Sequence, residues 1–199
     1  MSVIGFDLVR SEPYLDGTEF GETGAYQRID AVAHYAIDPS HPANSGITDL
    51  HLAETNENGQ VSFDGDVTLL LPVNKARANG ALLIEAPNRG HPLALRSFNR
   101  APFDQIPSDV IEPGDGFLMH HGWSMAFVGW QWDVPRSSHR LGLRAPTVPL
   151  SKLEKLSEMQ LRIQPNVPTD VFELTDQHVG LSAITVLSLR SSQSMSQRA

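Results

Sequence analysis

The sequence predicts an α/β protein with a β-rich N-terminal region, and three features of the chain indicate this class. Two short continuous apolar runs, at 81–85 and 123–130, are typical of strands buried on both faces of a parallel sheet. About forty residues with helical pieces separate the two runs, enough for a crossover between parallel strands. The 15 glycines and 14 prolines among 199 residues predict many short elements joined by turns.

The N-terminal residues predict strands separated by turns. Residues 3–9 alternate weakly between apolar and polar side chains and predict a first strand, which ends in the turn-rich stretch 11–24. Residues 31–37 predict a second strand. It is closed by Asp38-Pro39, because a proline moves the residue before it out of helical backbone space.

A hairpin is predicted next, around the Asn-Gly pair at 58–59. Both residue types tolerate the positive φ angles of a tight turn, so the short apolar segments 50–52 and 61–63 are its expected strands. The Asp-Gly-Asp triplet at 64–66 is interpreted as a turn, and 66–73 as a further strand.

The crossover between the two apolar runs contains the predicted helices. Residues 93–99 predict one or two helical turns, and Pro-Gly-Asp-Gly at 113–116 predicts a turn. Residues 117–122 fit a short helix that ends at its glycine. Together with the strands at 81–85 and 123–130, they predict a right-handed βαβ unit.

The C-terminal part is predicted to hold less regular structure. After Pro135 the chain becomes polar, with a helical pattern at 151–158 and a strand-like alternation at 159–163. All 23 acidic residues lie before position 177, and 182–199 is rich in serine. Such a composition buries little apolar surface, so we expect a disordered or non-native tail over 181–199.

Composition argues against several classes of function. The net charge of −8, from 23 acidic and 15 basic residues without a basic cluster, argues against nucleic-acid binding. The absence of cysteine excludes disulfides, thiolate zinc sites and iron–sulfur clusters. No apolar run approaches the ~20 residues of a membrane-spanning helix, and the first residues lack the basic start of a signal peptide. We therefore expect a cytoplasmic protein that does not enter a membrane.

No catalytic residue, metal site or cofactor is predicted. Ser124 lies in a G-x-S-x-A pattern, but a nucleophile elbow needs a strand before the serine and a helix after it. Here the predicted helix comes first, so Ser124 is interpreted as an ordinary strand residue. The histidines lack the HxxxH or HxH spacing of metal sites, and the adjacent pair His120-His121 diverges on a helix.

Two loops are candidate ligand-binding segments because each follows a buried apolar run. In open parallel sheets, ligands bind beyond the carboxyl ends of the strands. The candidates are Asn88, Arg89, Gly90 and His91 after the first run, and Gln131, Trp132 and Asp133 after the second.

Two side-chain questions concern the same loops. Arg89 is expected either to contact an anionic substrate or to pair with Asp133 or Glu85, and the spacing leaves both interpretations open. The aromatic residues around the second run are interpreted as a core cluster rather than a ligand platform. They are Trp123, Phe127, Trp130 and Trp132.

Three segments, 20–44, 69–95 and 113–135, resemble a large bacterial family that is described as alpha/beta hydrolase domain-containing protein. They read FGETGAYQRIDAVAHYAIDPSHPAN, LLLPVNKARANGALLIEAPNRGHPLAL and PGDGFLMHHGWSMAFVGWQWDVP. The resemblance runs from about Phe6 to Val179 and corresponds to the N-terminal third of the family's members, which are similar to esterases.

The resemblance implies an incomplete sheet of an α/β-hydrolase-like fold over 1–180. It implies that Asn88-Arg89-Gly90 takes the place of the oxyanion loop after the third strand, and that 123–130 is the fourth strand. His91, Gln131, Trp132 and Asp133 would line the pocket. The serine elbow of the family follows the fifth strand, beyond position 199.

Two functions are therefore expected from the sequence. The first is the N-terminal fragment of a serine hydrolase, arising by truncation, a frameshift or a gene-model error. It would be inactive alone, and a small ester would be its substrate only in the complete protein. The alternative is a non-catalytic β-rich binding module. In either case the fourth strand, at 123–130, is expected to leave an apolar free edge that favours aggregation. No oligomeric state is predicted.

Overall fold

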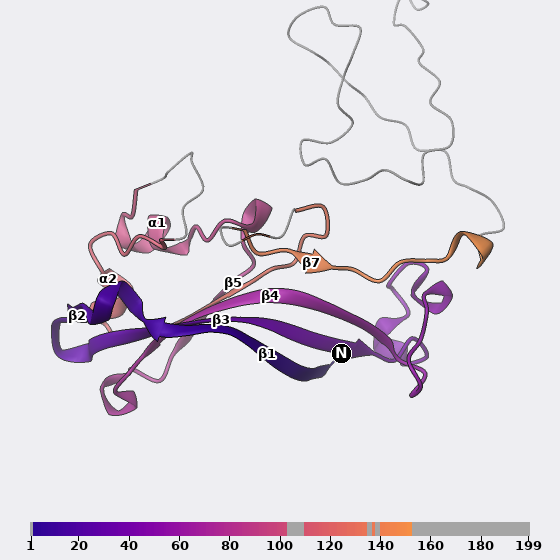
Figure 1. The fold of residues 1–199 in the computed structure, drawn as a ribbon, viewed down its shortest axis with the longest axis horizontal. Helices are drawn as coiled ribbons and strands as arrows, with labels where there is room; N and C mark the ends of the chain where they lie inside the picture. The colour runs from indigo at the N-terminus through magenta and orange to yellow at the C-terminus, as the bar shows by residue number, and fades with distance from the viewer. Residues whose placement is uncertain (1, 103–109, 135–136, 138–139, 153–199) are drawn as a thin grey trace, which may run out of the picture.

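The computed structural model describes residues 2–102, 110–134, 137 and 140–152, and in them one mixed sheet of seven strands (Figure 1). The main strand order is β1-β3-β4-β6-β5; β2 pairs with β3, and β7 pairs with β4. The strands are β1 Ser2–Pro13, β2 Glu19–Phe20, β3 Gly24–Ile37, β4 Val61–Pro72, β5 Leu82–Glu85, β6 Ser124–Val128 and β7 Leu143–Arg144.

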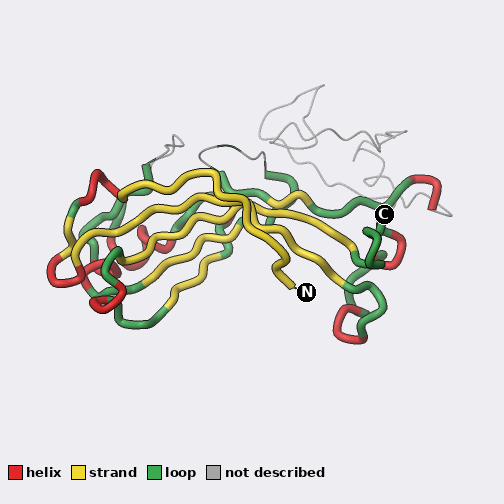
Figure 2. The backbone as a smooth tube through the Cα atoms, turned by 60° about the horizontal axis from the view of Figure 1, so that its bottom comes forward, coloured by secondary structure: helices red, strands yellow, loops and turns green. Residues whose placement is uncertain are grey.

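Two short α-helices, α1 Ala94–Asn99 and α2 Phe117–His120, lie on the same side of the sheet (Figure 1). Helical segments gather toward the two ends of the long strands (Figure 2). No helix in the described residues is long and apolar enough to cross a membrane. The 3-10 turns are Tyr14–Gly17, Gly21–Thr23, Pro42–Asn44, Leu50–Leu52, Lys75–Arg77, Asn88–Gly90 and Leu150–Lys152.

The predicted pair of parallel strands with a helical crossover between them is confirmed. β5 and β6 are adjacent and parallel, with Leu82 opposite Ser124 and Glu85 opposite Phe127. Both predicted helices form in the crossover. The turn before α2 closes with the N–H of Gly116 on the carbonyl of Pro113 at 3.1 Å.

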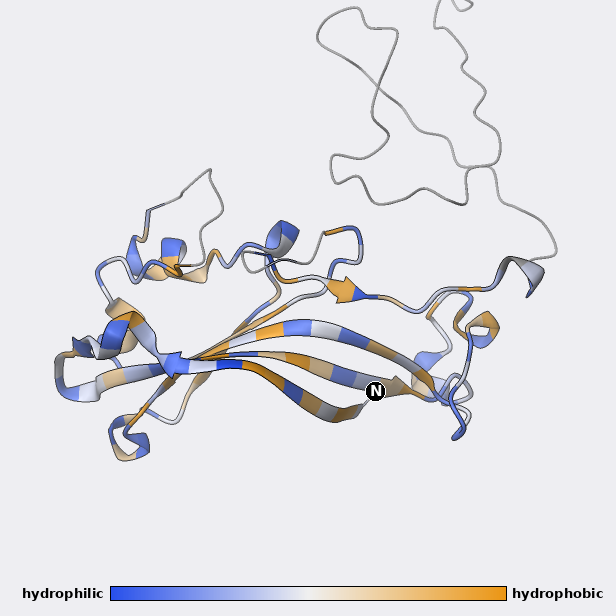
Figure 3. Cartoon of the chain, in the orientation of Figure 1, coloured by the Kyte–Doolittle hydropathy of each residue, from blue (hydrophilic) through white to orange (hydrophobic). Residues whose placement is uncertain are grey.

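β1, β3 and β4 are longer than the sequence pattern predicts. Polar and apolar residues alternate along them (Figure 3), and the strands predicted at 3–9 and 31–37 lie inside β1 and β3. The turn predicted at 64–66 is wrong, because these residues continue β4. Asp64 pairs with Arg144 at 3.3 Å, and Asp66 accepts the N–H of Gly142 at 2.9 Å. Partners from a distant part of the chain thus satisfy both carboxylates within a strand.

The predicted hairpin between 50–52 and 61–63 is also wrong. Residues 61–63 pair instead with the end of β3 in antiparallel fashion, with Ile37 opposite Val61. Leu50 begins a 3-10 turn and packs with Ala53 against those two residues. The short apolar segment therefore covers the end of the β3–β4 pair instead of forming a strand. The turn at Gly59, which has φ +73°, is present and leads into β4.

The expectation that 81–85 is buried on both faces is wrong. Leu82 and Ile84 alternate along β5 and share one face, and they are 52% and 67% exposed, so this face of the strand is uncovered. The expected free edge is also misplaced, because β6 lies between β4 and β5. Among the described residues, the unpaired edge on this side therefore belongs to β5.

Of the helix predicted at 151–158, only the first two residues are described, and they belong to the turn Leu150–Lys152. The strand predicted at 159–163 and the tail predicted at 181–199 lie outside the described residues. The folded unit predicted over 1–180 is therefore described only as far as residue 152, and the sheet lies within that part.

The main hydrophobic core lies between the sheet and the two helices, and Asn99 is a fully buried polar residue within it. Its amide group donates to the carbonyl of Pro113 at 2.9 Å and contacts the sulfur of Met119 at 3.1 Å. Its side-chain oxygen accepts the N–H of Leu118 at 3.0 Å, and its backbone carbonyl accepts that of Asp115 at 2.7 Å. One side chain thus joins the end of α1 to the turn before α2 and to α2 itself.

A buried tyrosine attaches α2 to the sheet. The hydroxyl group of Tyr26, on β3, lies 2.9 Å from the carbonyl of Trp123 and 3.1 Å from that of Met119. Burial raises the pKa of Tyr26 to about 12, because ionisation would place a charge in the core. The phenol therefore stays neutral throughout the neutral range and keeps its single O–H proton, which lies within reach of both carbonyls.

A cluster of charges joins the first three neighbouring strands of the sheet. Asp30 on β3 pairs with Arg10 on β1 at 2.6 Å and with Arg28 at 3.1 Å. It also accepts the hydroxyl of Thr68 on β4 at 2.7 Å. Arg28 and Thr68 are buried, so the carboxylate is surrounded by donors on the face that carries the core. Such a cluster fixes the register of β1, β3 and β4 because a shift of one residue would separate the charges.

Replacing Asn99 by alanine is expected to lower the free energy of unfolding by about 2–4 kcal/mol, since buried partners lose their hydrogen bonds. Urea denaturation of 1–199, followed by tryptophan fluorescence, measures this change. Asn58→Ala, at an exposed turn, is the matched control and should change it by less than ~0.5 kcal/mol. Equal stability of the two variants would contradict the role of Asn99.

The open edge of β5 is expected to limit solubility. Ile84→Lys places a charge on this edge and should raise the protein concentration at which aggregates form. Ser97→Lys, on the exposed side of α1, makes the same change of charge away from the edge and should have little effect. Light scattering at increasing concentration compares the two. A similar improvement in both variants would show that net charge, and not the edge, controls aggregation.

Candidate functional site

The two candidate loops meet at the carboxyl ends of β5 and β6. The first contains the 3-10 turn Asn88–Gly90 after β5, and the second contains Gln131 and Asp133 after β6. Because β5 and β6 are parallel neighbours, both loops leave the sheet at the same end of the two strands. The structure therefore brings the two predicted segments together.

Arg89 connects the loops through both its side chain and its backbone. Its Nη1 lies 2.6 Å from Oδ2 of Asp133, and its Nη2 lies 3.5 Å from the carbonyl of the same residue. The backbone N–H of Arg89 donates to Oε1 of Gln131. The indole N–H of Trp130 donates to the carbonyl of Pro87 at 2.9 Å. Asp133 is therefore one partner of the Arg89 guanidinium, a pairing that the sequence had left open.

Glu85, considered from the sequence as a partner of Arg89, binds the start of α1. Its two carboxylate oxygens accept the N–H groups of Leu93 and Ala94, each at 2.8 Å. These groups belong to the start of α1, where backbone donors lack partners within the helix. Glu85 therefore holds the start of α1 against the end of β5 and fixes where the loop between them returns.

The turn has a left-handed backbone. Arg89 has φ 53° and ψ 28°, and Gly90 has φ 78°. A Cβ atom at Gly90 would lie 2.9 Å from both N and O of Leu141, whose N–H donates to the carbonyl of Gly90 at 3.0 Å. Positive φ is uncommon for a residue with a side chain. The contacts of Arg89 on both sides compensate for this backbone conformation.

The remaining predicted residues differ in exposure. His91 is half-buried and its N–H donates to the carbonyl of Asn88 at 3.2 Å, whereas the Asn88 side chain is exposed. Trp130 and Trp132 are 52% and 60% exposed, so the predicted aromatic core cluster is wrong for these two. Phe127 is fully buried in the core, and Trp123 packs against it. The two exposed tryptophans lie beyond Val128, the last residue of β6.

Ser124 is the first residue of β6, and α2 precedes it, as predicted. Its N–H donates to the carbonyl of Ala81 at 3.0 Å, which continues the β5–β6 ladder. No hydrogen bond joins its hydroxyl group to a histidine within the described residues. Among the described residues, Ser124 therefore has no hydrogen-bonded histidine that could act as the base of a serine nucleophile.

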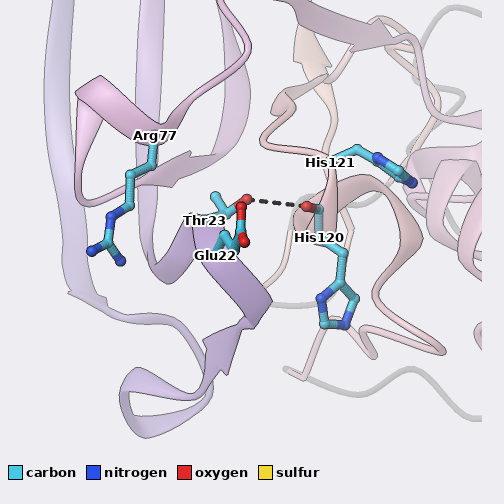
Figure 4. Close-up of a pocket in the computed structure, with 5 residues that line it drawn as sticks. All are labelled: Glu22, Thr23, Arg77, His120 and His121. Atoms are coloured by element: carbon cyan, nitrogen blue, oxygen red, sulfur yellow. Dashed lines mark hydrogen bonds between the residues drawn. The ribbon is translucent and has the colours of Figure 1, made fainter.

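A second polar site, which the sequence did not predict, is a hollow of about 680 Å³. It lies at the end of the crossover that leads into β6, whereas the two candidate loops follow the ends of β5 and β6. The hydroxyl of Thr23 donates to the carbonyl of His120 at 3.2 Å (Figure 4). The ring of His120 packs against Phe20. The side chains of Arg77 and His121 point in different directions in Figure 4. The lining residues are Glu22, Thr23, Arg77, His120 and His121.

In the described part of the chain, no group of three or more metal-ligating side chains lies close enough together to hold a metal ion. The residues of the hollow come from three segments that are distant in sequence, namely 21–23, 75–77 and 117–121. The adjacent pair His120-His121 is the one part of this hollow that the sequence analysis considered, and the two side chains point in different directions (Figure 4).

Comparison with known proteins found no matching family model, no matching curated protein and no matching solved structure.

Gly90→Ala is expected to destabilise the protein more than Gly59→Ala. Both glycines have positive φ, of 78° and 73°, but a Cβ atom at Gly59 would meet nothing within 4 Å. The difference between the two variants therefore isolates the close contact with Leu141, and we expect it to be about 1–3 kcal/mol. Urea denaturation of both variants measures it. Equal losses would show that the loop moves freely to accommodate the methyl group.

Proposed function

We propose that this chain forms the N-terminal part of a serine hydrolase that acts on carboxylic esters. The resemblance of segments 20–44, 69–95 and 113–135 to alpha/beta hydrolase domain-containing proteins supports this proposal. The mixed sheet, with two parallel strands joined through a helical crossover, is compatible with it. In this proposal the protein acts in the cytoplasm on a small ester, without a cofactor, a metal or nucleic acid.

The observation that carries the proposal is the N–H of Arg89. This donor lies at the carboxyl end of β5, in a turn fixed by Asp133 and Trp130, and it binds a side-chain amide oxygen of Gln131. An oxyanion hole needs such a donor, fixed before the substrate arrives. One donor of this kind contributes ~2.7–4 kcal/mol to transition-state binding when a nucleophile places an oxyanion beside it.

The catalytic serine, its histidine and the acid would come from outside the described residues. Among the described strands, β5 pairs only with β6, so its other edge can accept the strand that precedes the serine elbow. His91, Gln131, Trp132 and Asp133 would line the substrate pocket beside this strand. Within this proposal, residues 1–199 alone supply an oxyanion donor but no nucleophile and therefore do not hydrolyse esters.

A non-catalytic binding module is the second candidate. The exposed side chains of Trp130 and Trp132 favour it, because large aromatic surfaces next to a charged pair are typical of binding sites. The two candidates differ in what completes the sheet: a strand with a serine elbow in the first, and none in the second.

An esterase assay distinguishes them. Purified 1–199 is expected to hydrolyse p-nitrophenyl acetate and butyrate no faster than buffer. A longer protein that carries these residues followed by a G-x-S-x-G segment should hydrolyse both. In that longer protein, replacing the elbow serine by alanine should abolish activity, whereas Ser124→Ala should leave it unchanged.

Two results would reject the proposed function. Inactivity of the longer, folded protein on both esters would favour the binding module. Turnover by 1–199 alone that Ser124→Ala abolishes would show instead that Ser124 is the nucleophile.

A further inference from the structure

The backbone N–H of Arg89 already has an acceptor in the free protein. Gln131 provides it through Oε1 of its side chain. The neighbours of Gln131 hold the two loops together, because Trp130 donates to Pro87 at 2.9 Å and Asp133 pairs with the guanidinium at 2.6 Å. The amide oxygen is therefore kept at the donor by contacts on both sides of it.

A ligand oxygen and Oε1 of Gln131 would need the same position. The neighbouring donor in the turn, the N–H of Gly90, makes a hydrogen bond of 3.4 Å to the carbonyl of Pro87. The N–H of Arg89 is thus the donor that points between the loops. A charged oxygen binds an N–H more strongly than a neutral amide oxygen does, so a carboxylate or an oxyanion can replace Gln131 there.

The side chain of Gln131 can leave without disturbing the sheet. Its backbone carbonyl accepts the N–H of Leu143 at 3.0 Å, next to the pairing of β7 with β4. This bond anchors the backbone while rotation about the side-chain bonds removes Oε1 from the donor. The ion pair between Arg89 and Asp133 does not involve the amide group and can stay in place.

We propose that Gln131 is a positioning residue whose amide oxygen occupies the Arg89 N–H in the free protein and gives way to a ligand carboxylate or oxyanion. The inference rests on the proposed function, in which this N–H is the oxyanion donor. Gln131 keeps the donor aligned, and its displacement lowers the affinity for the incoming anion. Removal of the amide oxygen therefore strengthens anion binding at this position.

Nuclear magnetic resonance of 1–199 labelled with ¹⁵N-arginine tests the proposal. The amide signal of Arg89 is identified by its loss in Arg89→Lys. Sodium acetate is the carboxylate probe, added at constant ionic strength against sodium chloride. In Gln131→Ala the Arg89 signal should start at a different position and respond to acetate with an affinity about threefold to tenfold higher than in the wild type, the equivalent of one hydrogen bond.

A matched control is available on β3. Gln27→Ala removes a glutamine side chain that donates to Ser11 at 3.1 Å, far from the loops, and should leave the Arg89 signal and its response to acetate unchanged. Equal acetate affinity in the wild type and Gln131→Ala would overturn the proposal. An Arg89 signal that does not move when Gln131 is replaced would overturn it too, since the hydrogen bond would then be absent in solution.

The outcome is separable from that of the esterase assay. If the longer protein hydrolyses esters but the acetate affinity is the same in the wild type and Gln131→Ala, this inference is rejected and the proposed function stands. Acetate binding that strengthens in Gln131→Ala, together with an inactive longer protein, rejects the hydrolase and retains an anion site that Gln131 occupies.

Discussion

The buried side chain of Asn99 fixes the geometry on which the candidate site depends. Its hydrogen bonds join the end of α1, the turn at Pro113 and the N–H of Leu118 in α2. These bonds hold the end of α1 against α2, the helix that directly precedes β6. The loops after β5 and β6 meet because the two strands pair in parallel. A polar group in the core thus supports the crossover that joins the two strands whose loops carry Arg89 and Asp133.

The contacts within the site follow from this arrangement. Two loops that follow the same ends of neighbouring parallel strands bring backbone donors and side-chain acceptors together, and here Arg89 binds both Gln131 and Asp133 across them. Arg89 accounts for the pairing with Asp133 and with Gln131, while Glu85 uses both oxygens on the start of α1. The result is a fixed donor at positive φ, which is the property that the proposed function uses.

The sequence predicts local features of this fold better than its distant pairings. The two helices, the βαβ unit and the two loops follow from apolar runs and turn residues that lie close together in the chain. The triplet at 64–66 was misread because its carboxylates are satisfied by Gly142 and Arg144, far along the sequence. The exposed edge was misplaced because spatial order differs from chain order. The hollow lined by Arg77 and His120 could not be predicted, since its residues come from three separate segments.

The position of β5 also constrains the order in which the chain can fold during synthesis. β1, β3 and β4 pair with one another in antiparallel fashion and can form as soon as they leave the ribosome. β5 emerges next, but its partner β6 follows only after a crossover of about forty residues. In the interval β5 has no native neighbour, and β4 presents the unpaired edge that belongs to β6. The nascent chain must therefore keep these two apolar segments apart until the crossover is complete, a period in which chaperone binding would have its greatest effect.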